Sequence, residues 1–255
     1  MKNFFISIFL LTGLLASLSS KGQAIFQTKK AKSWADSVLL DMSIDEKIGQ
    51  LFMVSAYSNL GEAHTSEVLE QIKKYHVGGL IFFQGGPVRQ AHLTNLYQSK
   101  SELPLMIGMD AEWGLSMRLD STFKFPWAMT VGAVQDTELV YNMGLEMGKQ
   151  CKRLGVHINF APVLDINTNP DNPIINARSF GQNKEAVTWH AYEMMKGMQD
   201  AGVLACGKHF PGHGDTETDS HKTLPTIDFD EKRIDSVEMY PYKKLIKEGL
   251  SSVMV

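Results

Sequence analysis

The chain has 255 residues, 44% of them hydrophobic and 21% charged, which is an ordinary globular composition with room for one large domain or two small ones. The formal net charge of −3, without a basic run or patch, argues against a nucleic-acid partner. The aromatic residues are scattered and form no stacking motif for single strands.

Residues 1–24 have the pattern of a secretory signal peptide. Lys2 gives a positive start, an apolar run extends from Phe4 to Leu18, and Gly22-Gln23-Ala24 fits a small-x-small cleavage site. We therefore expect cleavage near Ala24 and an exported protein, periplasmic or secreted. A membrane anchor is the competing interpretation. The apolar run is short for a span of about 20 residues, so we expect no stable span after cleavage.

The only two cysteines are Cys151 and Cys206. Export implies an oxidising compartment, yet two cysteines do not make a disulfide framework. We expect free, buried thiols, and a single bridge between them stays open as the alternative.

Strand-like and helix-like segments alternate along residues 25–255. Short apolar runs predict strands at 49–54, 77–83, 105–110, 158–165, 203–209 and 251–255. Helical spacing predicts helices at 65–75, 88–100, 138–154, 184–201 and 234–248. Apolar strands that alternate with helices are typical of a parallel sheet covered by helices.

Polar side chains stand at the ends of three predicted strands: Asp110, Asp165, and then Lys208 with His209. This pattern predicts an α/β fold of the TIM (β/α)8 barrel type, whose active site lies at the C-terminal ends of the strands. An open doubly wound sheet is the alternative, but no Gly-x-Gly-x-x-Gly follows an early strand. The sequence stops at Val255 within an apolar run. We therefore expect a C-terminally truncated catalytic barrel of about six β/α units over 25–255.

The segment from Lys208 to His221 carries the densest group of titratable side chains in the chain. Pro211 and Gly212 prevent it from being helical throughout, and it follows an apolar strand. Enzymes tend to place catalytic groups in such loops, although a solvated polar loop is the plain alternative.

Further groups are expected on the same face, from Asp110 to Arg118 and around Arg178. Carboxylates accept hydrogen bonds from the vicinal hydroxyls of a sugar, and Arg and Lys donate to them. Trp113 and Phe180 are candidates for an apolar surface under a sugar ring.

Each of these residues also has a structural interpretation. Asp110 caps a helix in that interpretation, and Arg118 and Arg178 form structural ion pairs. Asp165 either fixes its own Asn-rich loop or touches the substrate, and His213 orders its loop through backbone hydrogen bonds.

A metal-dependent hydrolase is the strongest rival enzyme class, because the loop offers three histidines and two aspartates as zinc ligands. His209 and His213 would need a helix to face the same way, but Pro211 and Gly212 stand between them. We therefore expect no metal and no cofactor.

The motifs resemble glycoside hydrolase family 3, in its β-N-acetylglucosaminidase branch. The resemblance rests on Lys208–Gly214 followed by Asp219-Ser220-His221, with Asp110–Arg118 and Arg178-Ser179-Phe180 in the matching order. It covers residues 31–255. It implies a TIM barrel and a retaining hydrolase that releases terminal β-linked N-acetylglucosamine from glycans such as peptidoglycan fragments.

The resemblance also implies residue roles. His221 would act as general acid and then general base, oriented by Asp219, and the nucleophile would be an Asp beyond Val255. The side chains that would bind the sugar at its non-reducing end are Asp110, Arg118, Arg178, Lys208 and His209.

Two positions depart from the common form of the motif: Ala111 stands where Gln is usual, and Trp113 where Gly is usual. These departures concern the finer sugar contacts. A β-glucosidase-type member of the family stays open as an alternative, and so does a carbohydrate-binding barrel without turnover, because the expected nucleophile is not among these residues.

Overall fold

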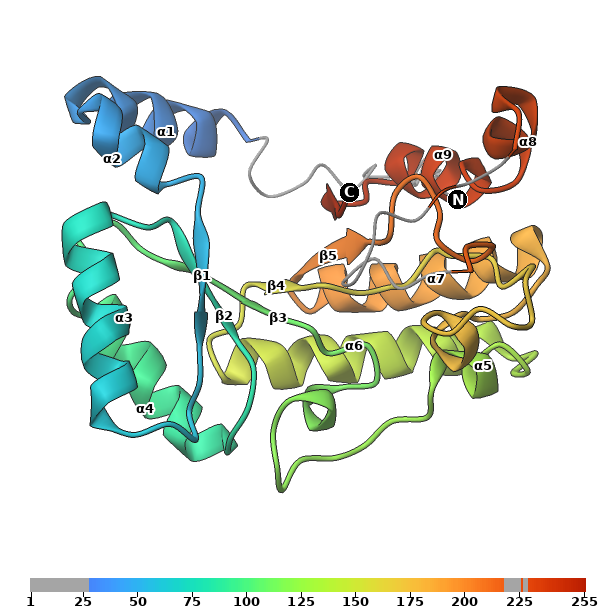
Figure 1. The fold of residues 1–255 in the computed structure, drawn as a ribbon, viewed down its shortest axis with the longest axis horizontal. Helices are drawn as coiled ribbons and strands as arrows, with labels where there is room; N and C mark the ends of the chain where they lie inside the picture. Colours follow the sequence, from blue (N-terminus) through green and yellow to red (C-terminus); the bar gives the residue numbers. More distant parts are fainter. Residues whose placement is uncertain (1–27, 218–225, 227–228) are drawn as a thin grey trace, which may run out of the picture.

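The computed structural model describes residues 28–217, 226 and 229–255, with a parallel sheet at its centre (Figure 1). Its strands follow one another in chain order, each paired in parallel with the next. Helices lie between successive strands, so the predicted alternation is confirmed. The strands are β1 Met53–Ala56, β2 Gly79–Phe82, β3 Met106–Met109, β4 Ile158–Asn159, β5 Leu204–Gly207 and β6 Ser252–Val253.

Polar residues at the helix starts explain where several helices begin. The side chains of Ser43, Asp136, Asn183 and Asp230 each accept a backbone N–H of the first turn that has no partner within the helix. The helices are α1 Lys29–Asp41, α2 Ile44–Gly49, α3 Glu62–Tyr75, α4 Pro87–Gln98, α5 Ala128–Val131, α6 Thr137–Arg153, α7 Lys184–Asp200, α8 Glu231–Ser236 and α9 Tyr240–Lys247, with short 3₁₀ turns η2 Leu115–Met117 and η3 Asn176–Arg178.

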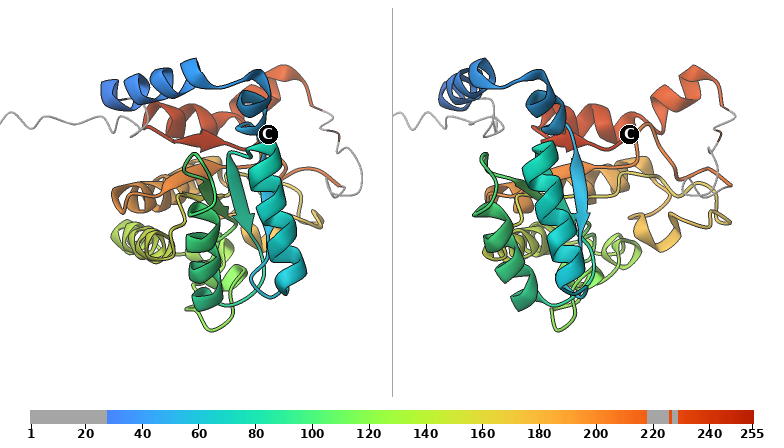
Figure 2. Two further views of the ribbon diagram at one scale, coloured as in Figure 1. Left: turned by 90° about the vertical axis from the view of Figure 1, so that its left-hand side faces the viewer. Right: turned by 60° about the vertical axis from the view of Figure 1, so that its left-hand side comes forward.

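The longest helices, α6 and α7, run side by side along the sheet (Figure 1). Small residues allow this close approach. A Cβ on Gly144 would lie 2.4 Å from the carbonyl oxygen of Met194, and one on Gly197 would lie 2.2 Å from that of Tyr141. Elsewhere, α3 and α4 lie next to each other over the β1–β2 part of the sheet (Figure 2). In the middle of the sheet, Phe82 and Ile107 are completely inaccessible.

Three predicted boundaries are wrong. Gly49 ends α2 instead of beginning a strand, because the Ser43–Glu46 capping box starts a helix there and β1 begins only at Met53. The regular part of β4 has two residues, since Pro162 offers no N–H to continue the ladder. The helix predicted over 234–248 is two helices, because Pro241 fits only the first turn of α9.

Cys151 and Cys206 are both free and buried, as predicted. Burial raises the pKa of the Cys151 thiol to about 12. The predicted signal peptide, residues 1–24, lies outside the described residues. Within the described ranges, no helix is both long and apolar enough to cross a membrane.

Candidate active site

Three predicted site residues meet where the strands end. Asp110 directly follows β3, while Lys208 and His209 directly follow β5. Parallel strands present their C-terminal ends at the same edge of a sheet, so side chains far apart in sequence converge there. The Lys208 Nζ lies 2.8 Å from the Asp110 Oδ1 across this edge. The sequence-based grouping of these residues therefore has a geometric basis in the fold.

The Asp110 carboxylate is held between two cations. Lys208 contacts one oxygen, and the Arg118 Nη2 lies 2.8 Å from the other. The turn between Asp110 and Arg118 needs Gly114, whose φ of 85° is in a region that L side chains rarely adopt. Burial raises the pKa of Asp110, but Lys208 and Arg118 together outweigh it and leave that pKa below its ordinary value. The alternative in which Asp110 caps a helix is wrong.

Lys208 is the most enclosed cation of the group, with a side chain only 3% exposed. Its Nζ lies 2.8 Å from Asp110 and 2.8 Å from Glu112. An ammonium group with so little access to water needs close anions, because desolvation of an unpaired charge costs several kcal/mol. The two carboxylates together meet that requirement.

Glu112 is a central residue of the cluster that was not among the predicted site residues. Its carboxylate accepts two hydrogen bonds from Arg178, at 2.7 Å from Nη2 and 3.0 Å from Nε. Burial raises the pKa of Glu112, but Arg178 and Lys208 outweigh burial and lower it to about 2. Charge balance could have found this residue. Among the side chains predicted to bind the sugar, Asp110 was the one carboxylate, set against the three cations Arg118, Arg178 and Lys208.

Asp165 anchors the loop that follows β5. Its side chain is fully buried, and it accepts hydrogen bonds from the backbone N–H of His213 at 2.7 Å and from the ring of His209 at 2.6 Å. The side chain therefore fixes the histidine loop instead of the Asn-rich loop and is buried away from a substrate, while the backbone oxygen of Asp165 accepts the Ser179 hydroxyl of its own loop. His213 also contacts the Thr216 hydroxyl, so its predicted loop-ordering role agrees with the geometry.

The remaining predicted residues have different positions. Asp219 and His221 lie outside the described residues. Phe180 is buried against His190, so it offers no surface to a sugar ring and that expectation is wrong. Trp113 stacks on Trp127 at 4.6 Å between ring centroids. Trp127 is 38% exposed, which leaves this pair as the aromatic candidate.

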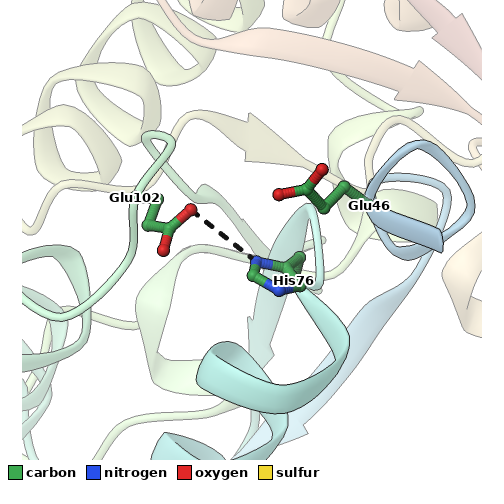
Figure 3. A group of neighbouring side chains, drawn as sticks. All are labelled: Glu46, His76 and Glu102. Carbon is green, nitrogen blue, oxygen red and sulfur yellow. Dashed lines mark ion pairs between the residues drawn. The ribbon is translucent and has the colours of Figure 1, made fainter. Parts of the chain in front are cut away.

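One group of side chains in the described ranges has potential metal-ligand atoms within 4.8 Å of one another: Glu46, His76 and Glu102 (Figure 3). They precede β1, β2 and β3, so they lie at the opposite edge of the sheet from Asp110. Glu46 accepts the Ser43 N–H in a helix cap, and Glu102 is a 78% exposed partner of His76. The helix cap made by Glu46 and the surface ion pair between His76 and Glu102 therefore explain why these three side chains lie together. Within the described residues, His209 and His213, which the alternative zinc interpretation needs as ligands, do not belong to a group of this kind.

Comparison with known proteins places the chain in a family. The family described as "Glycosyl hydrolase family 3 N terminal domain" matches residues 43–255. The chain belongs to glycoside hydrolase family 3. The matched region contains all of the cluster described above.

Named relatives and solved structures agree with this assignment. The chain is 38% identical to beta-hexosaminidase A of Pseudoalteromonas piscicida over 71% of its length, and 31% identical to the beta-hexosaminidase LpqI of Mycobacterium tuberculosis over 84%. It covers 32% and 54% of those two proteins.

The solved structures extend the comparison to three dimensions. A family 3 β-N-acetylglucosaminidase from Paenibacillus matches with a TM-score of 0.75 and 37% identity, over 84% of this chain and 42% of that one. The beta-glucoside phosphorylase BglX matches with a TM-score of 0.85 and 25% identity, over 91% and 41%. The predicted barrel-type fold is thereby confirmed. The chain spans about a third to a half of the length of these proteins.

Proposed function

We propose that the protein is a retaining glycoside hydrolase that releases terminal β-linked N-acetylglucosamine. Membership of family 3 and relatives named beta-hexosaminidase support the reaction class. The observation that carries the proposal is the Asp110 carboxylate, fixed by Arg118 and Lys208 at the C-terminal edge of the sheet. A carboxylate in that position can accept hydrogen bonds from neighbouring sugar hydroxyls.

The cluster suits a neutral, polyhydroxylated ligand. Its cations are Arg118, Arg178 and Lys208, and its carboxylates are Asp110, Glu112 and Asp165, so the formal charges of these six side chains cancel. The cluster therefore holds both donors and acceptors and has no net formal charge that would favour an anion. A sugar ring can exchange hydrogen bonds with both kinds of group.

We propose that His221 supplies the proton for the departing oxygen and that Asp219 orients its ring. An imidazole is suited to this role because its ordinary pKa of about 6.5 lies close to working pH. The nucleophile in this proposal is an Asp contributed beyond Val255. Retaining enzymes attack the sugar with such a group while the acid protonates the leaving group.

A family 3 β-glucosidase or glucoside phosphorylase is the second candidate function, favoured by the structural match to BglX. The higher identity to proteins named beta-hexosaminidase and β-N-acetylglucosaminidase favours the first candidate. Paired nitrophenyl glycosides separate them. We expect the full-length protein to turn over the N-acetylglucosaminide faster than the glucoside, with no gain from added phosphate.

The variant Asp110→Asn tests the binding cluster in the same assay. It removes a charge that strengthens hydrogen bonds to hydroxyls, so kcat/KM should fall by about 10- to 100-fold. Asp120→Asn is the matched control, because Asp120 is an exposed aspartate paired with Arg89 at the surface. Equal activity of both variants would exclude Asp110 from substrate binding. Absence of turnover in the unchanged full-length protein would instead favour the carbohydrate-binding alternative.

We further propose that the protein is exported after cleavage near Ala24 and acts on fragments such as those of peptidoglycan. The sequence pattern of residues 1–24 motivates the first part. Mass spectrometry of the protein recovered from cell fractions tests it, since an uncleaved N-terminus in the cytoplasmic fraction would contradict it.

A further inference from the structure

We infer that Phe83 is a positioning residue of the site: its ring holds the guanidinium group of Arg118 in a fixed plane beside Asp110 before a substrate binds. The inference rests on the proposed function, because it concerns how one of the proposed sugar-binding side chains is kept in place. Phe83 was predicted only as the last residue of an apolar strand. The structure gives it a contact with the site.

The first observation is the register of the strands. Phe82 of β2 lies beside Met109 of β3 in the parallel pairing. The next residue along each chain is Phe83 in one case and Asp110 in the other, so these two stand side by side at the C-terminal edge of the sheet. The Phe83 N–H continues the ladder on its other side and donates to the carbonyl oxygen of Ala56 at 3.0 Å. The backbone of Phe83 is therefore fixed next to the proposed sugar-binding carboxylate.

The second observation is that the backbone brings Arg118 back over Phe83. The segment around Arg118 is tied to the segment that follows β2, since the Asp120 N–H donates to the carbonyl oxygen of Gly85 at 2.8 Å and Leu119 forms a parallel bridge with Gly85. The Arg118 Cζ then lies over the Phe83 ring, 4.9 Å from its centre. A guanidinium group within about 6 Å of an aromatic face is attracted to it.

The third observation is that hydrogen bonds alone do not fix the plane of Arg118. Arg178 donates to Glu112 through two nitrogens, and two bonds to one carboxylate set the plane of a guanidinium group. Arg118 donates to Asp110 through Nη2 only, and a single bond leaves the group free to turn about it. The Arg118 Nε is buried and has no acceptor within the described ranges of the chain. The Phe83 ring supplies the second constraint, because a planar guanidinium group stacks on an aromatic face.

The fourth observation is that Phe83 is itself held in place. The Tyr57 ring stacks on it, with 5.5 Å between the ring centres and 22° between the planes. Tyr57 directly follows β1, and its backbone N–H donates to the His64 Nε2 at 3.1 Å. A ring that could turn freely would not keep a guanidinium group in one plane. The stack on Tyr57 limits that rotation.

Two substitutions at Phe83 test the consequence for turnover in the full-length protein. Phe83→Leu removes the aromatic face and should lower kcat/KM for an aryl N-acetylglucosaminide by about 3- to 30-fold. Phe83→Tyr keeps the face and should stay within about twofold of the parent. Phe123→Leu is the matched control, because Phe123 is 64% exposed, and it should change neither constant. Equal losses with leucine and tyrosine, or no loss with leucine, would overturn the inference.

A double-mutant cycle separates positioning of Arg118 from a general effect on packing. Arg118→Gln removes the cation that the ring holds. If Phe83 acts through Arg118, adding Phe83→Leu to that variant should lower kcat/KM by less than about twofold more. A second loss as large as the one in the parent protein would show that Phe83 acts independently of Arg118 and overturn the inference.

Nuclear magnetic resonance tests the contact without any substrate. In ¹⁵N-arginine-labelled full-length protein, Arg118→Gln identifies the Arg118 Nε–H signal, which burial of this atom should protect from exchange with water. Phe83→Leu should shift that signal, because the ring current of the aromatic face is lost, and Phe83→Tyr should preserve its position. An unchanged signal in folded Phe83→Leu protein would overturn the inference. A shifted signal in a protein without hydrolase activity would instead refute the proposed function alone.

Discussion

Glu112→Gln should destabilise the protein strongly although it changes only a carboxylate to an amide of the same shape. The pKa of Glu112 is lowered from 4.5 to about 2, and each unit corresponds to about 1.4 kcal/mol. The carboxylate therefore contributes about 3 kcal/mol to the free energy of unfolding at neutral pH. This agrees with the 3–5 kcal/mol typical of removing one partner of a buried ion pair.

The pH dependence gives this prediction its sharpest form. Because the folded-state pKa is depressed, the contribution is fully present above the unfolded-state value and is lost as the pH falls through the folded-state value. The difference in unfolding free energy between the parent protein and Glu112→Gln should be constant above about pH 5. It should shrink between pH 4.5 and 2.

Urea denaturation at a series of pH values measures this difference. Glu185→Gln is the matched control, since its carboxylate is 57% exposed and lies 4.0 Å from its nearest cation. That control should change stability by less than about 1 kcal/mol. A loss below 1 kcal/mol for Glu112→Gln at pH 7, or a loss that does not vary with pH, would refute the electrostatic argument.

Three further predictions concern other parts of the chain. His221→Ala in the full-length enzyme should lower kcat by roughly 10²- to 10⁴-fold, and by less on a substrate with a very acidic leaving group; equal losses would count against an acid/base role. Cys151 and Cys206 should resist a thiol reagent until the protein unfolds, as spectrophotometric titration with and without denaturant would show, because burial raises the pKa of both thiols. Gly214→Ala should impair activity, since a Cβ on this residue of the histidine loop would lie 1.9 Å from the backbone oxygen of Ile166, in the loop after β4; Gly61→Ala, with no neighbour within 4 Å, should have no such effect.

Much of the fold could be predicted because buried parallel strands are apolar along their whole length. The runs around Leu80, Ile107 and Ala205 correspond to β2, β3 and β5. Boundaries failed where a local feature overrode the apolar pattern. A capping box converted the region before Met53 into a helix, and Pro241 divided one predicted helix into two. Helix α1 had no buried residue in the described chain, so no core-facing stripe indicated it.

The site was predictable to the extent that strand ends define it. Asp110 and Lys208 end apolar runs in the sequence, so their convergence follows from a parallel sheet. The partners of each side chain could not be predicted. Asp165 was expected to hold its own loop or the substrate, yet it holds the loop after the next strand. Such pairings depend on tertiary distances that no spacing along the chain encodes.

The arrangement of charges explains why the structure needs residues that no substrate must touch. Anions behind or beside the site orient several of its side chains: Glu112 orients Lys208 and Arg178, and Asp165 orients the His209 ring. Without those anions, the side chains would turn toward other acceptors or toward water before a ligand binds. Orientation in advance reduces the reorganisation needed when charge develops in the reaction. Loss of Glu112 should therefore weaken transition-state binding as well as folding, and a fall in kcat/KM in protein that is still folded would separate the two effects.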